Sequence, residues 1–332
     1  MKYYAGFIVQ LFLLLSSLVF LLLRSELEYL LVQGRGQIQM SFSARDIAEA
    51  LRDSAISLKQ KEGLMLSMQV LKFASEKGLH TGDAYTMYCD EKNEKQMWML
   101  SAVPSCSFES FQWSFPLFGS FSYKGFFSLN MALKEKKKLS EQGFDTELGK
   151  AAGWSTLGWF PDPVTASMLK RKPYDLAELL LHELVHKTVY LKDSVEWNEN
   201  LAVLCARNLC AEFLRQAGQE QWLHEYAVSL QAEDSLLAFA EHGKRWLSQK
   251  YAQKDFNKAD KQSLLKILVQ DFLSRSWSSE FPKYKIAASM LYNGNAWFQS
   301  HHRYGGGSKE LSEMLMKKHR GNVMAMLKEL KK

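Results

Sequence analysis

One stretch, LLLHELVHKTVYLKDSVEWNENLAVL from Leu179 to Leu204, carries most of the structural and chemical information in this sequence. It predicts two helices joined by a short turn, because apolar residues recur at helical spacing on both sides of the polar LKDSVE segment. His182 and His186 are four residues apart, so both side chains project from one face of the first helix. Two imidazoles in this arrangement can share one tetrahedral zinc ion.

Glu183 lies between the two histidines. Beside the open coordination position of a zinc ion, its carboxylate can take a proton from water and later return it to a leaving amine. The alternative is an ordinary helix that carries these side chains on its surface. Leu179–Leu181, Leu184 and Val185 favour a buried helix instead, in which the polar side chains would be costly without a metal partner.

The second helix is expected to begin near Glu196 and to bring a carboxylate back to the histidines. Glu199, in its early turns, would complete a site of two His and one Glu, with water in the fourth position. Asp193 and Glu196 are rivals for this role. Asp193 fits better as the cap of the second helix, because Asp193-x-x-Glu196 matches a capping box. Both rivals could also accept a hydrogen bond from a ligand imidazole.

The N-terminal segment Ala5–Leu23 contains no charged residue and is close to the length of about 20 residues that spans a bilayer. It predicts a membrane-spanning helix, and residues 1–24 are interpreted as an uncleaved signal anchor because no small-residue cleavage site follows. Positive charges tend to stay on the cytoplasmic side of a membrane-spanning helix. Lys2 and the N-terminal amine lie on one side of the segment and Arg24 on the other, which slightly favours a cytoplasmic N-terminus. The sequence thus predicts a single-pass protein of the cell membrane, partnered by the lipid bilayer, with the following domain on the periplasmic or extracytoplasmic side.

The composition of the 332 residues, with 47% hydrophobic and 23% charged, excludes a disordered chain. The formal net charge is +6, but the positive residues are scattered or gather on a helical face, as in Lys134–Lys138. No nucleic-acid partner is therefore predicted. No Ser-, Pro- or Gly-rich linker interrupts the chain, which favours one catalytic domain over residues 25–332.

The four cysteines form no CxxC pair and predict no second metal site. Cys89 and Cys106 fall in neighbouring strand-like segments, where a disulfide and two free thiols fit the sequence equally well.

Local patterns along the chain predict an α+β fold. Two helices are expected over Ser43–Leu79, opening at Ser43, and strands are expected in the aromatic-rich region Asp83–Phe127. A helix over Lys134–Gln142 and one more strand over Gly153–Phe160 follow, and the chain beyond Tyr174 is predicted to be helical. The expected fold is a small antiparallel sheet followed by a mainly helical part.

Several blocks resemble the predicted zinc aminopeptidase family of bacterial envelope proteins, a short-spaced gluzincin-like group. These are GWSTLGWFPDPV (Gly153–Val164), LLLHELVHKTVY (Leu179–Tyr190) and NENLA (Asn198–Ala202). The upstream blocks YLLVQGRGQIQM (Tyr29–Met40) and WSFPLFGSFSYKGFF (Trp113–Phe127) are similar to the family in the same order.

This resemblance implies a gluzincin-like metallopeptidase domain with Zn²⁺ as the cofactor. Carried over residue by residue, it implies His182, His186 and Glu199 as the metal ligands and Glu183 as the base. The sequence departs from the family pattern at Ala287–Ser289, where relatives tend to have an Asn-Asn-Ala run.

Tyr190 follows His186 by four residues, so its phenol is a candidate donor to the oxyanion of a tetrahedral intermediate. Packing at the helix end is its alternative role. Trp154 and Trp159 flank the strand that would bind an extended peptide by β-augmentation and are candidate cleft walls. His301 and His302 lie in a polar segment and receive no role.

Two classes of function follow from these observations. The first is zinc-dependent hydrolysis of a peptide substrate, as an aminopeptidase by the family resemblance or as an endopeptidase with the same chemistry. Glu178 and Asp162 are candidate anchors for the substrate's α-amine. The second is a non-catalytic envelope binding protein or chaperone with a structural zinc, which would have no use for Glu183. The sequence does not determine the oligomeric state.

Overall fold

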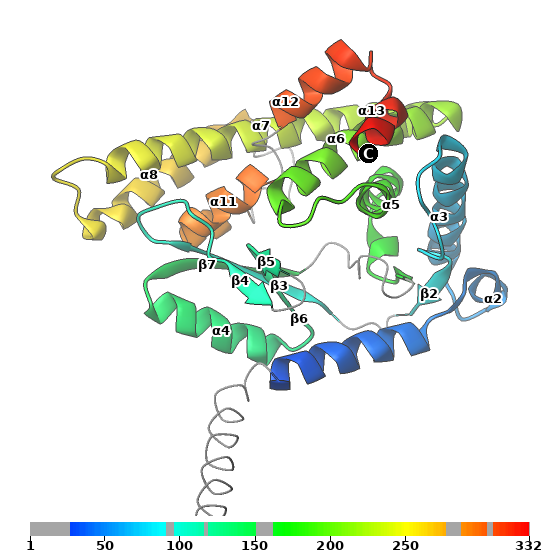
Figure 1. The fold of residues 1–332 in the computed structure, drawn as a ribbon, viewed down its shortest axis with the longest axis horizontal. Helices are drawn as coiled ribbons and strands as arrows, with labels where there is room; N and C mark the ends of the chain where they lie inside the picture. Colours follow the sequence, from blue (N-terminus) through cyan, green and yellow to red (C-terminus); the bar gives the residue numbers. More distant parts are fainter. Residues whose placement is uncertain are drawn as a thin grey trace, which may run out of the picture.

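The computed structural model describes residues 27–90, 96–115, 119–150, 162–276, 287–303 and 308–331. Figure 1 shows a mainly helical molecule with small sheets on one side, so the α+β class agrees with the prediction. After a helix over residues 27–43, the helices are α2 (Ile47–Arg52), α3 (Leu58–Lys77), α4 (Leu129–Glu141), α5 (Pro173–Thr188), α6 (Val195–Gln216), α7 (Glu220–Tyr251), α8 (Lys261–Ser274), α11 (Asn295–Arg303), α12 (Ser308–Glu313) and α13 (Val323–Leu330). The strands are β1 (Arg45–Asp46), β2 (Met87–Cys89), β3 (Trp98–Pro104), β4 (Trp113–Phe115), β5 (Gly119–Phe121), β6 (Lys124–Phe126), β7 (Phe144–Lys150) and β8 (Val164–Thr165).

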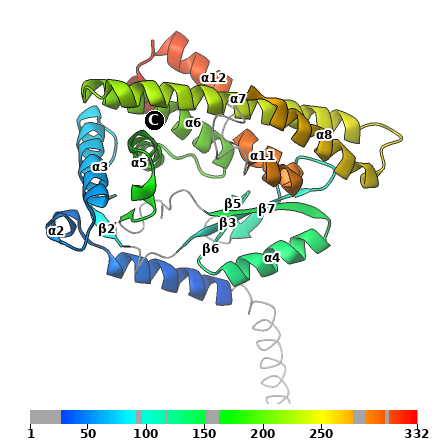
Figure 2. The same ribbon diagram turned by 180° about the vertical axis from the view of Figure 1, so that it is seen from behind.

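The helix α5 lies at the centre of the largest core. It begins at Pro173, whose fixed φ suits the first helical position, and packs between α3 and α6 (Figures 1 and 2). Leu180, Leu181, Leu184 and Val185 are all fully buried. The prediction of a buried helix is therefore confirmed, and the histidines that it carries are held by a rigid element.

The strands form three small sheets. In one, β3 pairs antiparallel with β6 and β7, and α4 and α11 pack against it (Figure 2). In the second, β4 and β5 form an antiparallel hairpin. In the third, β2 pairs antiparallel with β1 and parallel with β8. The prediction of one antiparallel sheet is thus wrong: the strands form three sheets, and β2 and β8 pair in parallel. Strands that pair across a long stretch of sequence leave no local pattern from which the pairing could be predicted.

The helix over residues 27–43 packs against strand β6. Tyr29 Oη donates to the carbonyl of Gly125 at 2.9 Å, and Gln33 Nε2 donates to the same carbonyl at 3.1 Å. A Cβ at Gly36 would lie 2.5 Å from the Phe127 ring, so only glycine allows this close approach. The prediction of a helix opening at Ser43 is wrong, since Ser43 ends this earlier helix.

The two predicted helices of this region exist as α2 and α3, with different caps. Asp46 Oδ1 accepts a hydrogen bond from the backbone of Ala48 at 2.6 Å and caps α2. Ser57 and Gln60 form a full capping box at the start of α3. The caps of these two helices are therefore Asp46 and Ser57, and not Ser43.

The membrane-spanning helix and the single-pass membrane location predicted from the sequence require correction. In the part of the chain that the structure describes, no helix is both long and apolar enough to span a bilayer. The segment Ala5–Leu23 itself lies outside the described residues, as does the predicted strand over Gly153–Phe160 with Trp154 and Trp159.

All four cysteines are free. Cys89 is buried and Cys106 is exposed, so of the two alternatives for this pair the structure has the free thiols.

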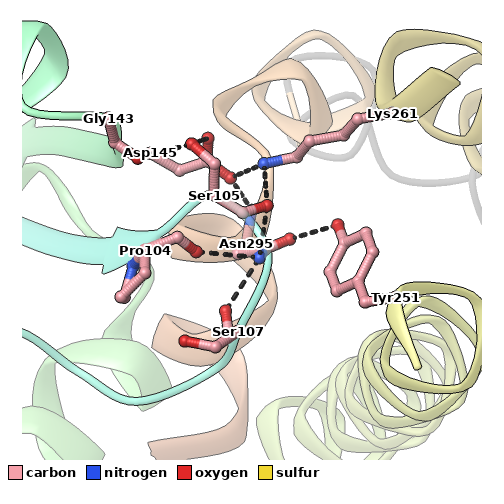
Figure 3. A network of polar contacts seen from close by, with 8 residues as sticks. All are labelled: Pro104, Ser105, Ser107, Gly143, Asp145, Tyr251, Lys261 and Asn295. Atoms are coloured by element: carbon pink, nitrogen blue, oxygen red, sulfur yellow. Dashed lines mark hydrogen bonds and ion pairs between the residues drawn. The ribbon is translucent and has the colours of Figure 1, made fainter. Parts of the chain in front are cut away.

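Asn295 connects α11 to the loop that follows β3. Its amide donates to the carbonyls of Pro104, Ser105 and Ser107 at 3.0, 3.1 and 2.8 Å, and its carbonyl accepts from Tyr251 Oη at 2.8 Å (Figure 3). The side chain is fully buried, and each of its polar groups is bonded. Such a satisfied network fixes the start of α11 against the sheet.

Asp145 and Lys261 extend the same network. Asp145 Oδ2 accepts from the backbone N–H of Asn295 at 2.6 Å and pairs with Lys261, which is buried and also donates to the Ser105 carbonyl at 2.8 Å (Figure 3). A Cβ at Gly294 would lie 2.2 Å from Asp145 Oδ2. The glycine therefore allows the carboxylate to reach the helix start.

We expect Asn295→Ala to lower the free energy of unfolding by about 3 kcal/mol, because it removes three hydrogen bonds to backbone carbonyls and the acceptor of the Tyr251 hydroxyl. Urea denaturation measures this loss. Asn208→Ala is the matched control, since Asn208 is exposed and its amide makes one hydrogen bond, to the Leu204 carbonyl. An Asn295→Ala loss as small as that of the control would contradict a structural role for the network.

Candidate metal centre

Helices α5 and α6 bring His182, His186 and Glu199 together. The two Nε2 atoms of the histidines are 3.1 Å apart. Glu199 Oε2 lies 3.3 Å from His182 Nε2 and 3.7 Å from His186 Nε2. The three side chains are 16%, 9% and 12% exposed, so the group is largely shielded from water yet reachable. In the described part of the chain this group can hold a metal ion.

The geometry fits a small tetrahedral cation. With zinc–ligand distances near 2.0–2.1 Å, the edge of a coordination tetrahedron is roughly 3.3 Å. The three measured separations of 3.1, 3.3 and 3.7 Å scatter around that value. Two neutral imidazoles and one carboxylate are also the donor set of a catalytic zinc site that keeps one position open.

Asn198 holds the turn that brings Glu199 to the histidines. Its Nδ2 donates to the Leu191 carbonyl at 2.7 Å, and its Oδ1 accepts from the Leu191 backbone N–H at 2.8 Å. The side chain is 2% exposed. No role of its own is predicted for Asn198 from the sequence. The sequence does place Asn198 directly before Glu199 and close to the turn. Backbone N–H and C=O groups of a turn need hydrogen-bond partners, which an asparagine side chain can supply.

The charges of the centre shift the pKa values of Glu199 and His182. Burial alone would raise the pKa of Glu199, but contacts with His182 and His186 hold it well below its usual range. Burial opposes the charged form of His182, yet the contact with Glu199 and the charges of nearby carboxylates raise its pKa. The carboxylate is thus ionised and placed to attract a cation.

Glu183 lies on α5 between the two histidines and is not part of the convergent group. Burial raises its pKa above the ordinary glutamate value, while the histidines act in the opposite direction. A carboxylate with a raised pKa is a better proton acceptor and donor near neutral pH.

The rivals of Glu199 lie outside the group. Glu196 is half exposed and lies 3.4 Å from His302 Nε2, while His302 Nδ1 is 2.7 Å from Glu241 Oε2. His302, for which the sequence suggested no role, therefore links α11 to α6 and α7. Asp193 does not cap α6, because Ser194 precedes the helix and no side-chain cap bond forms there.

Asp193 instead adopts a left-handed backbone conformation with φ 58° and packs on Gly119 of the β4–β5 hairpin. A Cβ at Gly119 would lie 2.3 Å from Asp193 Oδ1, so this close approach requires glycine. The hairpin is thereby joined to the α5–α6 turn.

Tyr190 lies just beyond the end of α5, which stops at Thr188. Its ring centroid is 6.3 Å from that of His186 in an edge-to-face arrangement, and the residue is 40% exposed. Burial and the charge of Glu199 raise its pKa. Its hydroxyl thus stays protonated near the centre, and its role as an oxyanion donor stays a prediction.

The two candidate anchors for a substrate amine are both engaged by basic side chains. Glu178 Oε1 lies 3.9 Å from Arg207 Nε, and Asp162 Oδ2 lies 3.5 Å from Lys187 Nζ. Burial, followed by the charge of Glu233, raises the pKa of Glu178 to about 7. Neither carboxylate is a free anchor.

The raised pKa of Glu178 predicts a pH dependence of stability. Its carboxyl binds a proton more tightly in the folded than in the unfolded chain, so it favours folding below pH 4.5 and this contribution is lost as the pH rises through about 7. Relative to Glu178→Gln, the zinc-free wild type should lose on the order of 2–3 kcal/mol of unfolding free energy between pH 4 and pH 8. Urea titrations of both proteins measure the difference. A difference that does not change with pH would contradict the assignment.

A polar cavity of about 490 Å³ borders the turn and the helix that supply Glu199. Carboxylates of Asp193, Glu196 and Glu310 line it, and among the residues that the structure describes no lysine or arginine does. The remaining walls are hydroxyl, amide and apolar side chains, from Ser110, Gln112, Ser120, Ser122, Ser194, Val195, Trp197, Asn200, Gln299 and Leu311. Its charge favours a cationic group.

Neither a curated protein nor a solved structure matches this chain. The model of one family, described as "Putative aminopeptidase", matches residues 28–332. The match includes α5 and α6, which carry His182, His186 and Glu199. Because it covers nearly the whole chain, this protein belongs to that aminopeptidase family.

Proposed function

We propose that this protein is a zinc-dependent peptidase that removes N-terminal residues from peptides, with Glu183 as the general base. The observation that carries the proposal is the convergence of His182 Nε2, His186 Nε2 and Glu199 Oε2 at the spacing of zinc ligands. Glu183 lies beside this group on the helix that supplies both histidines. A purely structural metal site would have no use for such a carboxylate.

Zinc, when bound, would act as a Lewis acid that polarises the scissile carbonyl and acidifies water. His182, His186 and Glu199 would hold it. Glu183 would accept the proton of the attacking water and deliver it to the nitrogen of the leaving amine, so the base is regenerated in each cycle. Burial of the Glu183 carboxyl supports this exchange, because it raises the pKa of that carboxyl and so makes the carboxylate a stronger base.

The acidic cavity supports the preference for a free N-terminus. An exopeptidase must recognise the protonated α-amine, and Glu178 and Asp162 are engaged by Arg207 and Lys187. The cavity offers three further carboxylates next to the start of α6. A cationic group of the substrate would be attracted there by charge and would find hydroxyl and amide groups for hydrogen bonding.

Metal analysis combined with a fluorogenic peptide panel tests the proposal. The purified protein is expected to contain about one zinc per chain and to cleave peptides with a free α-amine. Acetylated versions of the same peptides are the control, since acetylation removes the positive charge that an aminopeptidase must recognise.

Each outcome of the panel has a different meaning. Equal cleavage of free and acetylated peptides would identify an endopeptidase that uses the same chemistry. Zinc-loaded protein that cleaves nothing in the panel would contradict the peptidase proposal and favour a binding protein with a structural metal.

A further inference from the structure

Tyr85 has an unusual backbone conformation. Its φ of 59° lies in the left-handed region, which bulky side chains rarely adopt. Its backbone N–H donates to the carbonyl of Asp162 at 2.7 Å, and the residue is only 1% exposed. Residues in such conformations persist where their surroundings fix them, and they are common at functional sites.

The hydroxyl of Tyr85 is buried and, among the residues that the structure describes, has no hydrogen-bond partner. A phenylalanine would fill the same space without burying this polar group, so the hydroxyl is a cost to folding. A buried donor without a structural partner is available for a functional one.

Two contacts connect Tyr85 to helix α5 through Asp162. The Asp162 carboxylate, whose backbone carbonyl binds Tyr85, lies 3.5 Å from Lys187 Nζ. Lys187 follows the candidate ligand His186 and lies one helical turn after Glu183, on the same face of α5. Tyr85 is thus linked through Asp162 to the face of α5 that carries the base.

Electrostatics agree with this placement. Burial, together with the charges of Glu183 and then Asp162, raises the pKa of Tyr85 well above its ordinary value. The phenol therefore keeps its proton and stays a hydrogen-bond donor. Lys187 is engaged by Asp162, which leaves the Tyr85 hydroxyl as a donor available to Glu183.

We propose that Tyr85 is a positioning residue for Glu183: its hydroxyl donates a hydrogen bond to the Glu183 carboxylate during the reaction and aims that carboxylate at the attacking water. The inference rests on the proposed peptidase function. The phenol proton stays on Tyr85 throughout, and the proton that moves is the one from water to Glu183. The strained backbone of Tyr85 holds the ring in the place from which the hydroxyl can act.

Tyr85→Phe tests this role in the full-length, zinc-loaded protein. We expect kcat to fall about 10- to 100-fold, because a misaligned base costs rate rather than substrate affinity. KM and zinc content should stay at wild-type values, and the melting temperature should stay the same or rise, since no structural hydrogen bond is lost and an unpaired buried hydroxyl is removed. Tyr88→Phe is the matched control: Tyr88 is also fully buried, but its hydroxyl accepts a hydrogen bond from Gln60 Nε2 at 3.2 Å. That control should lower the melting temperature and leave kcat unchanged.

A double variant tests whether Tyr85 acts through Glu183. If it does, Tyr85→Phe added to Glu183→Gln should not lower the residual turnover further. An unchanged kcat in Tyr85→Phe, or the same fold-loss with and without Glu183, would overturn the inference.

Binding of a phosphinic dipeptide, which mimics the tetrahedral state, separates this inference from the proposed function. We expect Tyr85→Phe to weaken binding to the zinc-loaded protein by about 10-fold, because the inhibitor's oxygen lies where Glu183 meets the reacting water. Calorimetry measures the two Kd values. If the wild type binds the inhibitor but cleaves no peptide, the peptidase proposal fails, and the Kd ratio alone then decides the role of Tyr85: equal values overturn it.

Discussion

Glu183→Gln is expected to keep its zinc and its fold and to lose peptide hydrolysis by about 10²–10⁴-fold, the usual cost of removing a general base. Glutamine has nearly the shape of glutamate but cannot accept the proton of the attacking water at neutral pH. Glu183 does not belong to the convergent group of His182, His186 and Glu199, so the metal ligands are untouched. Fluorogenic peptide assays and metal analysis of the same preparation measure both properties.

The melting temperature of Glu183→Gln provides a further check. Replacing a buried carboxyl whose pKa is raised by burial with a neutral amide should not destabilise the fold near neutral pH, where ionising that carboxyl opposes folding. Full turnover in the variant would rule out Glu183 as the base. Loss of zinc together with turnover would instead place Glu183 among the ligands.

Glu199→Gln is expected to reduce zinc affinity by on the order of 10²-fold or more. Loss of a residue that only hydrogen-bonds to a metal ligand costs about 10- to 100-fold, and loss of a ligand itself should cost more. The Glu199 carboxylate lies beside both histidines and is held ionised by them, so it supplies the negative charge of the site. A neutral amide oxygen is a weaker ligand for zinc. Competition with a fluorescent zinc chelator measures the affinity.

Glu196→Gln is the matched control for Glu199→Gln. Glu196 lies three residues earlier on the same helix but is half exposed and contacts His302. We expect the zinc affinity of Glu196→Gln to stay within a few-fold of the wild type, because the contact with His302 that is lost is a partly exposed ion pair, and such pairs contribute little free energy. A larger loss in Glu196→Gln than in Glu199→Gln would reverse the assignment of the third ligand.

Together the two substitutions separate the roles of metal ligand and base. Glu199→Gln should lose metal and activity together, and excess zinc should restore part of the activity. Glu183→Gln should lose activity alone, and added zinc should not restore it. This contrast distinguishes an enzyme from a binding protein with a structural metal.

The sequence by itself determined the features that depend on local periodicity. His182 and His186 lie four residues apart, and the 3.6-residue helical repeat places them on one face whatever the rest of the chain does. The run Leu179–Val185 identified α5 as a buried helix for the same local reason. The start of the next helix near Glu196 followed from the polar turn.

The proximity of Glu199 was partly predictable, because a short turn between two helices brings their facing ends together. What the sequence did not reveal is how that turn is held. The Asn198 side chain satisfies both backbone groups of Leu191, and Asp193 packs on Gly119 more than seventy residues upstream. The capping box expected for Asp193 did not form: Ser194 occupies the N-cap position of α6, and Asp193 packs on Gly119 instead.

Only the tertiary structure decided the contacts between distant segments. Tyr85 reaches α5 through Asp162, and Asn295 binds carbonyls of residues 104–107, which lie some 190 positions earlier in the chain. Strand β2 pairs with β8 across more than seventy residues. Such contacts form because folding buries apolar surface and each buried polar group then needs a partner, wherever that partner lies in the sequence. The placement of the two histidines follows from local helical geometry, whereas the contacts that hold the Glu199 turn beside them follow from packing.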